Sequence, residues 1–96
     1  METSQLTIKA AQEFHGRMAA IIDAVQTGIW KNESQTLLGY STDYAFGTQR
    51  GLQTLVLKTR GRSAYVRLQW DTIMGDNSAD RQTVDNAVNG AIRELR

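Results

Sequence analysis

Two runs of alternating apolar and polar residues flank a short polar turn in the middle of the chain, and they predict a β-hairpin within residues 52–74. If Arg60 and Gly61 form a two-residue loop, both strands turn their mostly apolar side chains to the same face. That face pairs Leu57 with Ala64, Leu55 with Val66, Gln53 with Leu68 and Gly51 with Trp70. A slip by one residue would bury Arg67 and Gln69, so the pattern specifies the register strongly.

Amphipathic helices are predicted on both sides of this hairpin, over residues 4–27 and 79–96. The apolar arc of the first helix consists of Ile8, Ala11, Phe14, Met18, Ile21, Ile22 and Val25. The apolar arc of the second helix consists of Val84, Ala87, Val88, Ala91, Ile92 and Leu95. Gly28 is expected to end the first helix in the left-handed cap position, and Asn77 or Ser78 is expected to cap the start of the second.

The segment between the first helix and the hairpin has a less regular pattern. Alternation over residues 36–46 predicts either one long bent strand or two short strands around Thr42 and Asp43, and residues 29–31 are a further candidate strand. Consecutive strands with short connections favour an antiparallel meander of three or four strands, with both helices on one face. We therefore predict one two-layer α+β domain over residues 1–96, which is a length that supports a single core.

Composition excludes several kinds of chemistry. The chain has no cysteine and one histidine, which excludes disulfides, thiolate metal sites and multi-histidine sites within one chain. That residue, His15, is expected at the edge of the first helix, either packed against the sheet or touching solvent, and no serine has the setting of a nucleophile elbow. Residues 76–80 contain two aspartates and superficially resemble a calcium loop. Arg81 and Ala87, however, stand where such a loop needs glycine and glutamate, so helix capping explains this segment better. We expect a protein that is not an enzyme and needs no cofactor or metal.

Charge is distributed unevenly along the chain, although the net charge is only +1. Residues 1–43 and residues 71–96 each hold three cations and five acids, whereas residues 44–70 hold five cations and no acid. A basic segment of this kind attracts a phosphate backbone or an acidic protein surface. The alternative interpretation is that the two acidic ends fold against the basic middle and neutralise it.

An exposed aromatic ring among basic side chains predicts a binding surface on the polar face of the hairpin. Tyr65 is expected across from Val56, with basic residues on either side. In proteins that bind single-stranded nucleic acid, cations follow the phosphates and aromatic rings stack on the bases. Arginine, which dominates this segment, favours planar contacts with phosphate. The predicted contact residues are Arg50, Lys58, Arg60, Arg62, Tyr65 and Arg67. This pattern favours a non-enzymatic module that binds nucleic acid.

Two other functions stay open at this point. One is a protein-interaction regulator or inhibitor of the kind that phages and other mobile elements encode, anchored by the arginines and by Tyr40, Tyr44 and Phe46. The other is a small-ligand site, for a nucleotide, between the subunits of an oligomer. No apolar run approaches the length of a membrane span, so we expect no membrane partner and a cytoplasmic protein. The surplus of apolar groups on the strands predicts a twofold homodimer.

Overall fold

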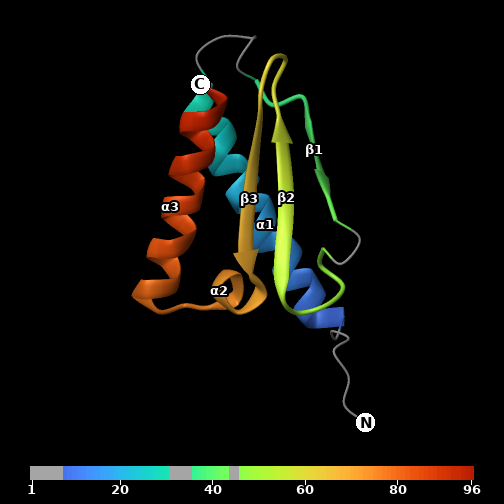
Figure 1. The fold of residues 1–96 in the computed structure, drawn as a ribbon. Coiled ribbons are helices and arrows are strands. Elements are labelled where there is room, and N and C mark those ends of the chain that lie inside the picture. The colour runs from blue at the N-terminus through green and yellow to red at the C-terminus, as the bar shows by residue number, and fades with distance from the viewer. Residues whose placement is uncertain (1–7, 31–35, 44–45) are drawn as a thin grey trace.

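The helices and the strand meander are both present in the computed structural model, which describes residues 8–30, 36–43 and 46–96. In chain order the elements are α1 (Ile8–Ile29), β1 (Gly39–Thr42), β2 (Leu52–Lys58), β3 (Ser63–Gln69), α2 (Trp70–Met74) and α3 (Ser78–Leu95) (Figure 1). The strands form an antiparallel sheet in the order β1-β2-β3. The predicted α+β architecture is therefore confirmed, with an N-terminal helix, an antiparallel meander and a C-terminal helix packed against the sheet.

The hairpin between β2 and β3 has the predicted register. Leu55 pairs with Val66, and the same offset holds along both strands. The backbone N–H of Trp70 donates to the carbonyl of Gly51 at 2.8 Å, so the predicted pairing of these two residues also holds. One face of the hairpin is buried throughout, which is the condition that makes a register slip costly. Its buried side chains are those of Gln53, Leu55, Leu57, Ala64, Val66 and Leu68.

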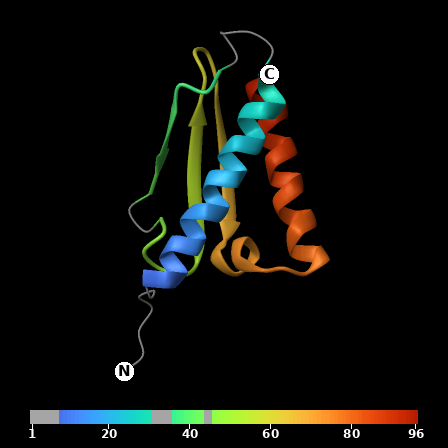
Figure 2. The ribbon, with the colours of Figure 1, turned by 180° about the vertical axis from the view of Figure 1, so that it is seen from behind.

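Both long helices lie on that buried face of the sheet and leave the other face open. In Figure 1, α1 passes behind the strands and α3 lies beside β3. Seen from behind, α1 crosses the sheet obliquely and meets α3 at its C-terminal end (Figure 2). The two helices supply the second layer of the core with Phe14, Met18, Ile21, Val25, Ile29, Ala91 and Leu95. Their predicted apolar arcs face inward, as the periodicity of the sequence indicates, except at Ile8, which is 79% exposed at the first turn of α1.

An aromatic cluster forms the centre of this core. The ring of Phe14 on α1 stacks on Trp70 with 4.4 Å between centroids and 11° between planes. Phe46, from the loop before β2, meets Phe14 edge to face at 5.2 Å. These arrangements are the ones that aromatic quadrupoles favour. The cluster therefore connects the first helix, the loop before β2 and the end of β3.

The second strand of the hairpin is shorter than the sequence pattern predicts. Strand β3 ends at Gln69, and Trp70 begins the five-residue helix α2 instead of continuing the strand to residue 74. Alternation alone did not reveal this change. Trp70 and Ile73 are three residues apart, which is a helical spacing, and both are buried in α2. The prediction of a strand as far as residue 74 was wrong at its C-terminal end.

The end of the first helix also differs from the prediction. Helix α1 continues through Gly28 to Ile29, which is fully buried, and Gly28 does not have a positive φ. The expected left-handed cap at Gly28 is therefore wrong, and so is the candidate strand at residues 29–31, whose first residue is helical. Gly28 instead allows α3 to approach α1 closely. A Cβ atom at this position would overlap Cδ1 of Ile92 and would lie 2.9 Å from its Cγ1. The predicted start of the helix at residue 4 lies outside the described residues.

The segment before the hairpin contains one short strand in its described part. Strand β1 covers only Gly39–Thr42, where the pattern allowed a strand over residues 36–46. Phe46 leaves the alternation because its ring turns into the core against Phe14. Residues 44 and 45 lie outside the described part, so the second short strand predicted here is not tested at those positions.

Two glycines of α1 give a test of the packing between the helices. Gly16 is exposed, and an added Cβ would meet no atom within 4 Å, so Gly16→Ala should stabilise the protein by about 0.5–1 kcal/mol through helix propensity. Gly28→Ala adds the same propensity but places a methyl group against Ile92. Because overpacking costs about 1–3 kcal/mol, Gly28→Ala should lower the free energy of unfolding. Urea denaturation of both variants measures the difference.

The double variant Gly28→Ala/Ile92→Val is the control for this interpretation. Shortening Ile92 removes the Cδ1 atom that the new methyl group meets, so the two substitutions should be coupled favourably. Equal stabilisation by Gly16→Ala and Gly28→Ala would show that the close approach of α1 and α3 is assigned incorrectly.

Candidate functional site

The face of the sheet that points away from the helices is the candidate site. We call the part of it that β2 and β3 carry the outer face. It consists of the side chains of Leu52, Thr54, Val56, Lys58, Ser63, Tyr65, Arg67 and Gln69. It has no acidic residue, and two of its large side chains are well exposed, Tyr65 at 52% and Leu52 at 49%. A two-layer domain leaves such a face to solvent or to a partner.

Tyr65 and Arg67 are in contact on the outer face. They are two residues apart on β3, so their side chains point in the same direction. The Cζ atom of Arg67 lies over the Tyr65 ring, 4.6 Å from its centroid, which is a cation–π geometry. Val56 and Thr54 stand opposite them on β2. The structure therefore brings the predicted aromatic ring and a predicted cation into contact.

Three more predicted cations surround the turn between β2 and β3, which we call the hairpin tip. Lys58 ends β2, and Arg60 and Arg62 lie in the turn, closed by a 2.9 Å hydrogen bond from the N–H of Thr59 to the carbonyl of Arg62. All three basic side chains are exposed. Within the described part of the chain, the ion pairs involve only Arg17 and Arg81 as cations, so the charges of the hairpin tip are not neutralised there.

Arg50 is the one predicted contact residue that the structure separates from the others. It precedes β2, whereas the hairpin tip follows β2, and the seven residues of that strand span about 23 Å. The buried side chain of Gln53 fixes the loop that carries Arg50. Its oxygen accepts from the N–H of Gly47 at 2.9 Å, and its nitrogen donates to the carbonyls of Gln49 and Gly51 at 2.8 and 3.1 Å. Arg50 therefore belongs to the opposite end of the outer face.

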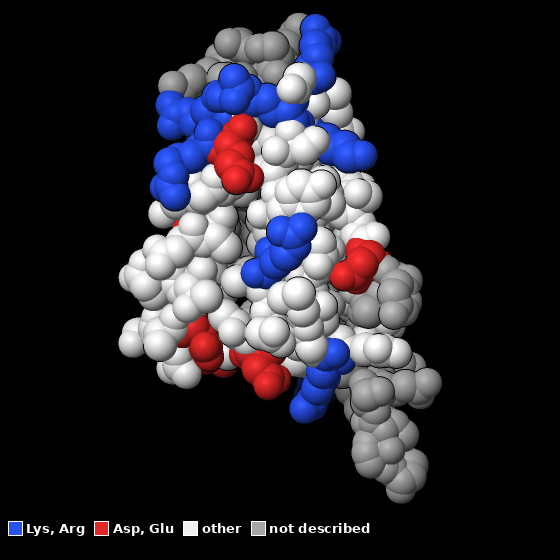
Figure 3. All heavy atoms as spheres, in the orientation of Figure 1, with Lys and Arg blue, Asp and Glu red and all other residues white. Residues whose placement is uncertain are grey.

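Two further cations lie near the hairpin tip and were not predicted as part of a site. Helix α3 runs in the direction opposite to β3, so its C-terminal residues Arg93 and Arg96 lie at the end of the molecule where β3 begins (Figure 1). Figure 3 shows the blue side chains gathered over the hairpin tip and this end of α3, with a red, acidic side chain beside them. The place of Arg93 and Arg96 along the chain alone did not indicate this position. The order of the elements, which makes α3 antiparallel to β3, was the available signal.

Arg17 shows what a purely structural arginine looks like in this protein. It donates to the carbonyls of Ile73 and Gly75 at 3.2 and 3.3 Å, and it forms ion pairs with Asp76 and Glu13 at 3.0 Å. The hydrogen bond with Asp76 raises the pKa of Arg17 above its ordinary value. Its donors are engaged in joining α1 to the segment between α2 and α3. Among the described residues, the cations of the hairpin tip have no comparable carboxylate partners.

The other residues considered for chemistry occupy structural positions. His15 is exposed on α1 and lies near the rings of Phe14 and Phe46, as expected for a residue at the edge of the helix. The side chain of Asn77 accepts a 2.7 Å hydrogen bond from the N–H of Asp80, which confirms the predicted cap of α3. Among the described residues, no three histidine or acidic side chains are grouped to hold a metal ion.

Comparison with known proteins does not add a further assignment. No family model, no curated protein and no solved structure matches this chain. In the parts of the chain that the structure covers, no helix combines the length and the apolar character needed to cross a membrane. The functional interpretation therefore depends on the side chains of the outer face and the hairpin tip.

Proposed function

We propose that this protein is a non-enzymatic module that binds single-stranded nucleic acid through the outer face and the hairpin tip. The observation that carries the proposal is the exposed Tyr65 ring with the Cζ atom of Arg67 over it, on a sheet face that neither long helix covers. The nearby exposed cations would follow the phosphates, while the ring would stack on a base. A cytoplasmic location belongs to the same proposal, because nucleic acid is accessible there.

The arrangement suits a single strand better than a duplex. Aromatic stacking needs a base with a free face, and the bases of a duplex already stack on one another. Tyr65 lies in the middle of a regular strand, and its backbone is held by pairing with Val56, so the ring is presented at a fixed position. Rigid presentation lowers the entropy that binding must offset.

The side chains of the outer face also favour binding over catalysis. A hydrolytic or transfer reaction needs a general base or a nucleophile with a partner. The outer face carries hydroxyl, amide, basic and apolar groups, and His15 belongs to α1, on the opposite side of the sheet. Groups of this composition bind phosphate and bases without moving a proton.

The dependence of binding on salt tests the role of the hairpin tip. Affinity for single-stranded DNA and RNA should fall steeply as salt rises, because phosphate contacts release counterions. Arg60→Ala and Arg62→Ala should each reduce the slope of log affinity against log salt by about 0.7, which is the expected loss per phosphate contact on a single strand. Both side chains are exposed, so the stability should change little.

Arg81→Ala is the matched control for these two variants, because it removes an exposed arginine at the start of α3, at the other end of that helix from the hairpin tip. It should leave the salt slope unchanged. If no binding to single-stranded DNA, duplex DNA or RNA is detected at low salt, the nucleic-acid proposal is rejected. The hairpin arginines would then be tested as contacts with an acidic protein partner.

Substitutions at Tyr65 and Arg67 test whether their stack contacts the ligand. Tyr65→Ala should weaken binding by roughly 1–3 kcal/mol if the ring stacks on a base, whereas Tyr65→Phe should retain most of the affinity. Arg67→Lys keeps the charge but loses the guanidinium group over the ring. If Arg67 contributed only its charge, the affinity would stay the same, so we expect Arg67→Lys to weaken binding. Fluorescence anisotropy of a labelled oligonucleotide measures both effects. Unchanged affinity in Tyr65→Ala would contradict base stacking at this face.

We also propose that the protein forms a twofold dimer through the edge of β1. This strand is one of the two edges of the sheet, and its four residues carry no charge. Leu38 and Tyr40 are 66% and 57% exposed. A groove of about 460 Å³ between α1 and β1 is lined partly by these two side chains. Pairing of two β1 strands would give hydrogen-bond partners to the backbone N–H and C=O groups of this edge. It would also place two outer faces in one continuous sheet.

Sedimentation at high micromolar concentration tests the dimer. The natural chain should sediment as a dimer, and Tyr40→Lys should sediment as a monomer, because two like charges would meet across the twofold axis. A natural chain that sediments as a monomer under these conditions would remove the dimer from the proposal without affecting the outer face.

A further inference from the structure

A second exposed aromatic side chain lies near the basic end of the molecule. Trp30 follows the last residue of α1, and its N–H continues the helical pattern by donating to the carbonyl of Gln26 at 3.0 Å. Its side chain is 66% exposed, although a large aromatic side chain gains much from burial. The other tryptophan, Trp70, is 3% exposed in the core. An exposed indole held at the end of a helix calls for a binding explanation.

Packing between α1 and α3 fixes the place of Trp30. Gly28 lies against Ile92, so the last turn of α1 is next to the last turns of α3. Arg93 and Arg96 lie at that end of α3 and are exposed. Trp30 therefore lies at the same end of the helix layer as Arg93 and Arg96. Neither arginine forms an ion pair with the described residues.

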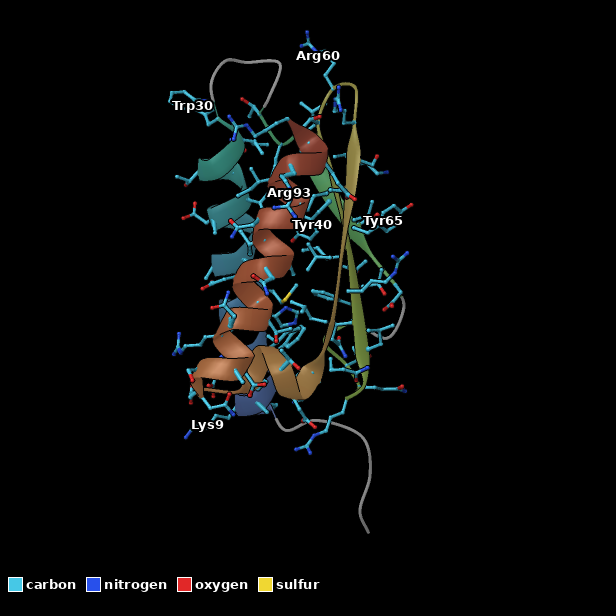
Figure 4. The ribbon with its side chains drawn as sticks, turned by 60° about the vertical axis from the view of Figure 1, so that its left-hand side comes forward. Lys9, Trp30, Tyr40, Arg60, Tyr65 and Arg93 are labelled. Carbon is cyan, nitrogen blue, oxygen red and sulfur yellow. The ribbon has the colours of Figure 1, made fainter. Side chains whose placement is uncertain are left out.

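The hairpin tip lies at this end as well. In Figure 4, Trp30 and Arg60 both project from the end of the molecule opposite to Lys9, and Arg93 lies on α3 further from that end than either of them. Figure 3 shows basic side chains over both the hairpin tip and the end of α3. The basic surface thus runs from the strand layer to the helix layer, with Tyr65 on one side of it and Trp30 on the other.

We propose that Trp30 is a second base-stacking site, joined to the Tyr65 site by a path for phosphates over Arg60, Arg62, Arg93 and Arg96. The inference rests on the proposed function and extends it from one face of the sheet to a strand that passes around the hairpin tip. A bound strand would be anchored by a ring in each layer. Aromatic rings for the bases, combined with cations for the phosphates, are the arrangement that single-strand binding surfaces use.

A lipid surface is the other partner that an exposed tryptophan with nearby arginines suggests. Interfacial helices bind lipid through a broad apolar face. Here the apolar faces of α1 and α3 are turned against the sheet, where Phe14, Val25 and Leu95 are buried. One indole without such a face fits a base better than a membrane.

The two tryptophans make the inference directly measurable. The probe is an oligothymidylate of about 16 nucleotides, compared with one of about 4 nucleotides, since single-strand sites span this range. Saturation with the longer oligomer should quench tryptophan fluorescence in the natural chain. Trp30→Phe should bind with similar affinity but show no quenching, because the remaining Trp70 is buried.

Affinity measurements separate this site from the Tyr65 site. Trp30→Ala should weaken binding of the longer oligomer roughly five- to 100-fold, which is the range expected for one lost stacking contact. Arg93→Ala should reduce the salt slope, whereas Arg81→Ala, on the same helix at its other end, should not. The shorter oligomer should depend on Tyr65 and be little affected by Trp30→Ala.

The possible failures are distinguishable. If Tyr65→Ala weakens binding but Trp30→Ala does not, or if saturation leaves the fluorescence unchanged, the second site is wrong and the proposed function stands. If neither oligomer binds, both proposals fail. If vesicles of phosphatidylserine and phosphatidylcholine shift the Trp30 emission while the oligomers do not quench it, Trp30 contacts lipid and the inference is overturned.

Discussion

The contact between Phe14 and Trp70 is the interaction on which the rest of the structure depends. Phe14 is fully buried, and its stack on Trp70 joins α1 to the point where β3 ends and α2 begins. The same ring meets Phe46, which holds the loop before β2. Because one aromatic cluster gathers these segments on one side of the sheet, α1 is confined to that side, and α3 packs beside it. The outer face is the consequence of this one-sided core.

Because the core lies on one side of the sheet, Arg17 has partners within the protein, whereas the basic side chains of the hairpin tip are exposed. Arg17 lies on the helix side, where backbone carbonyls and two carboxylates use its donors. Lys58, Arg60 and Arg62 belong to the far end of the hairpin, where the described chain offers them no carboxylate partner. Among the described residues, no ion pair joins an acid of either end of the chain to a cation of residues 44–70. Charge that is not used inside the protein is available to a ligand.

The sequence predicts the parts of the fold that depend on periodicity. The hairpin register followed from alternation on both strands, and the inward faces of α1 and α3 followed from helical spacing. Features that depend on contacts between distant elements could not be predicted in this way. Gly28 looked like a helix cap, because nothing local to it reveals that Ile92 packs against it. Trp70 looked like a strand residue, because its stack on Phe14 is a tertiary contact.

The same distinction explains what was missed at the candidate site. Tyr65, Arg67 and the cations of the hairpin tip are close in sequence, so their proximity could be predicted from the turn. Trp30 and Arg93 are far apart in the chain and share the basic end only because α1 and α3 converge there. A glycine that lets two helices approach is thus part of the reason why aromatic and basic groups of two layers lie at one end. Packing that gives stability also determines which exposed groups a single ligand could reach.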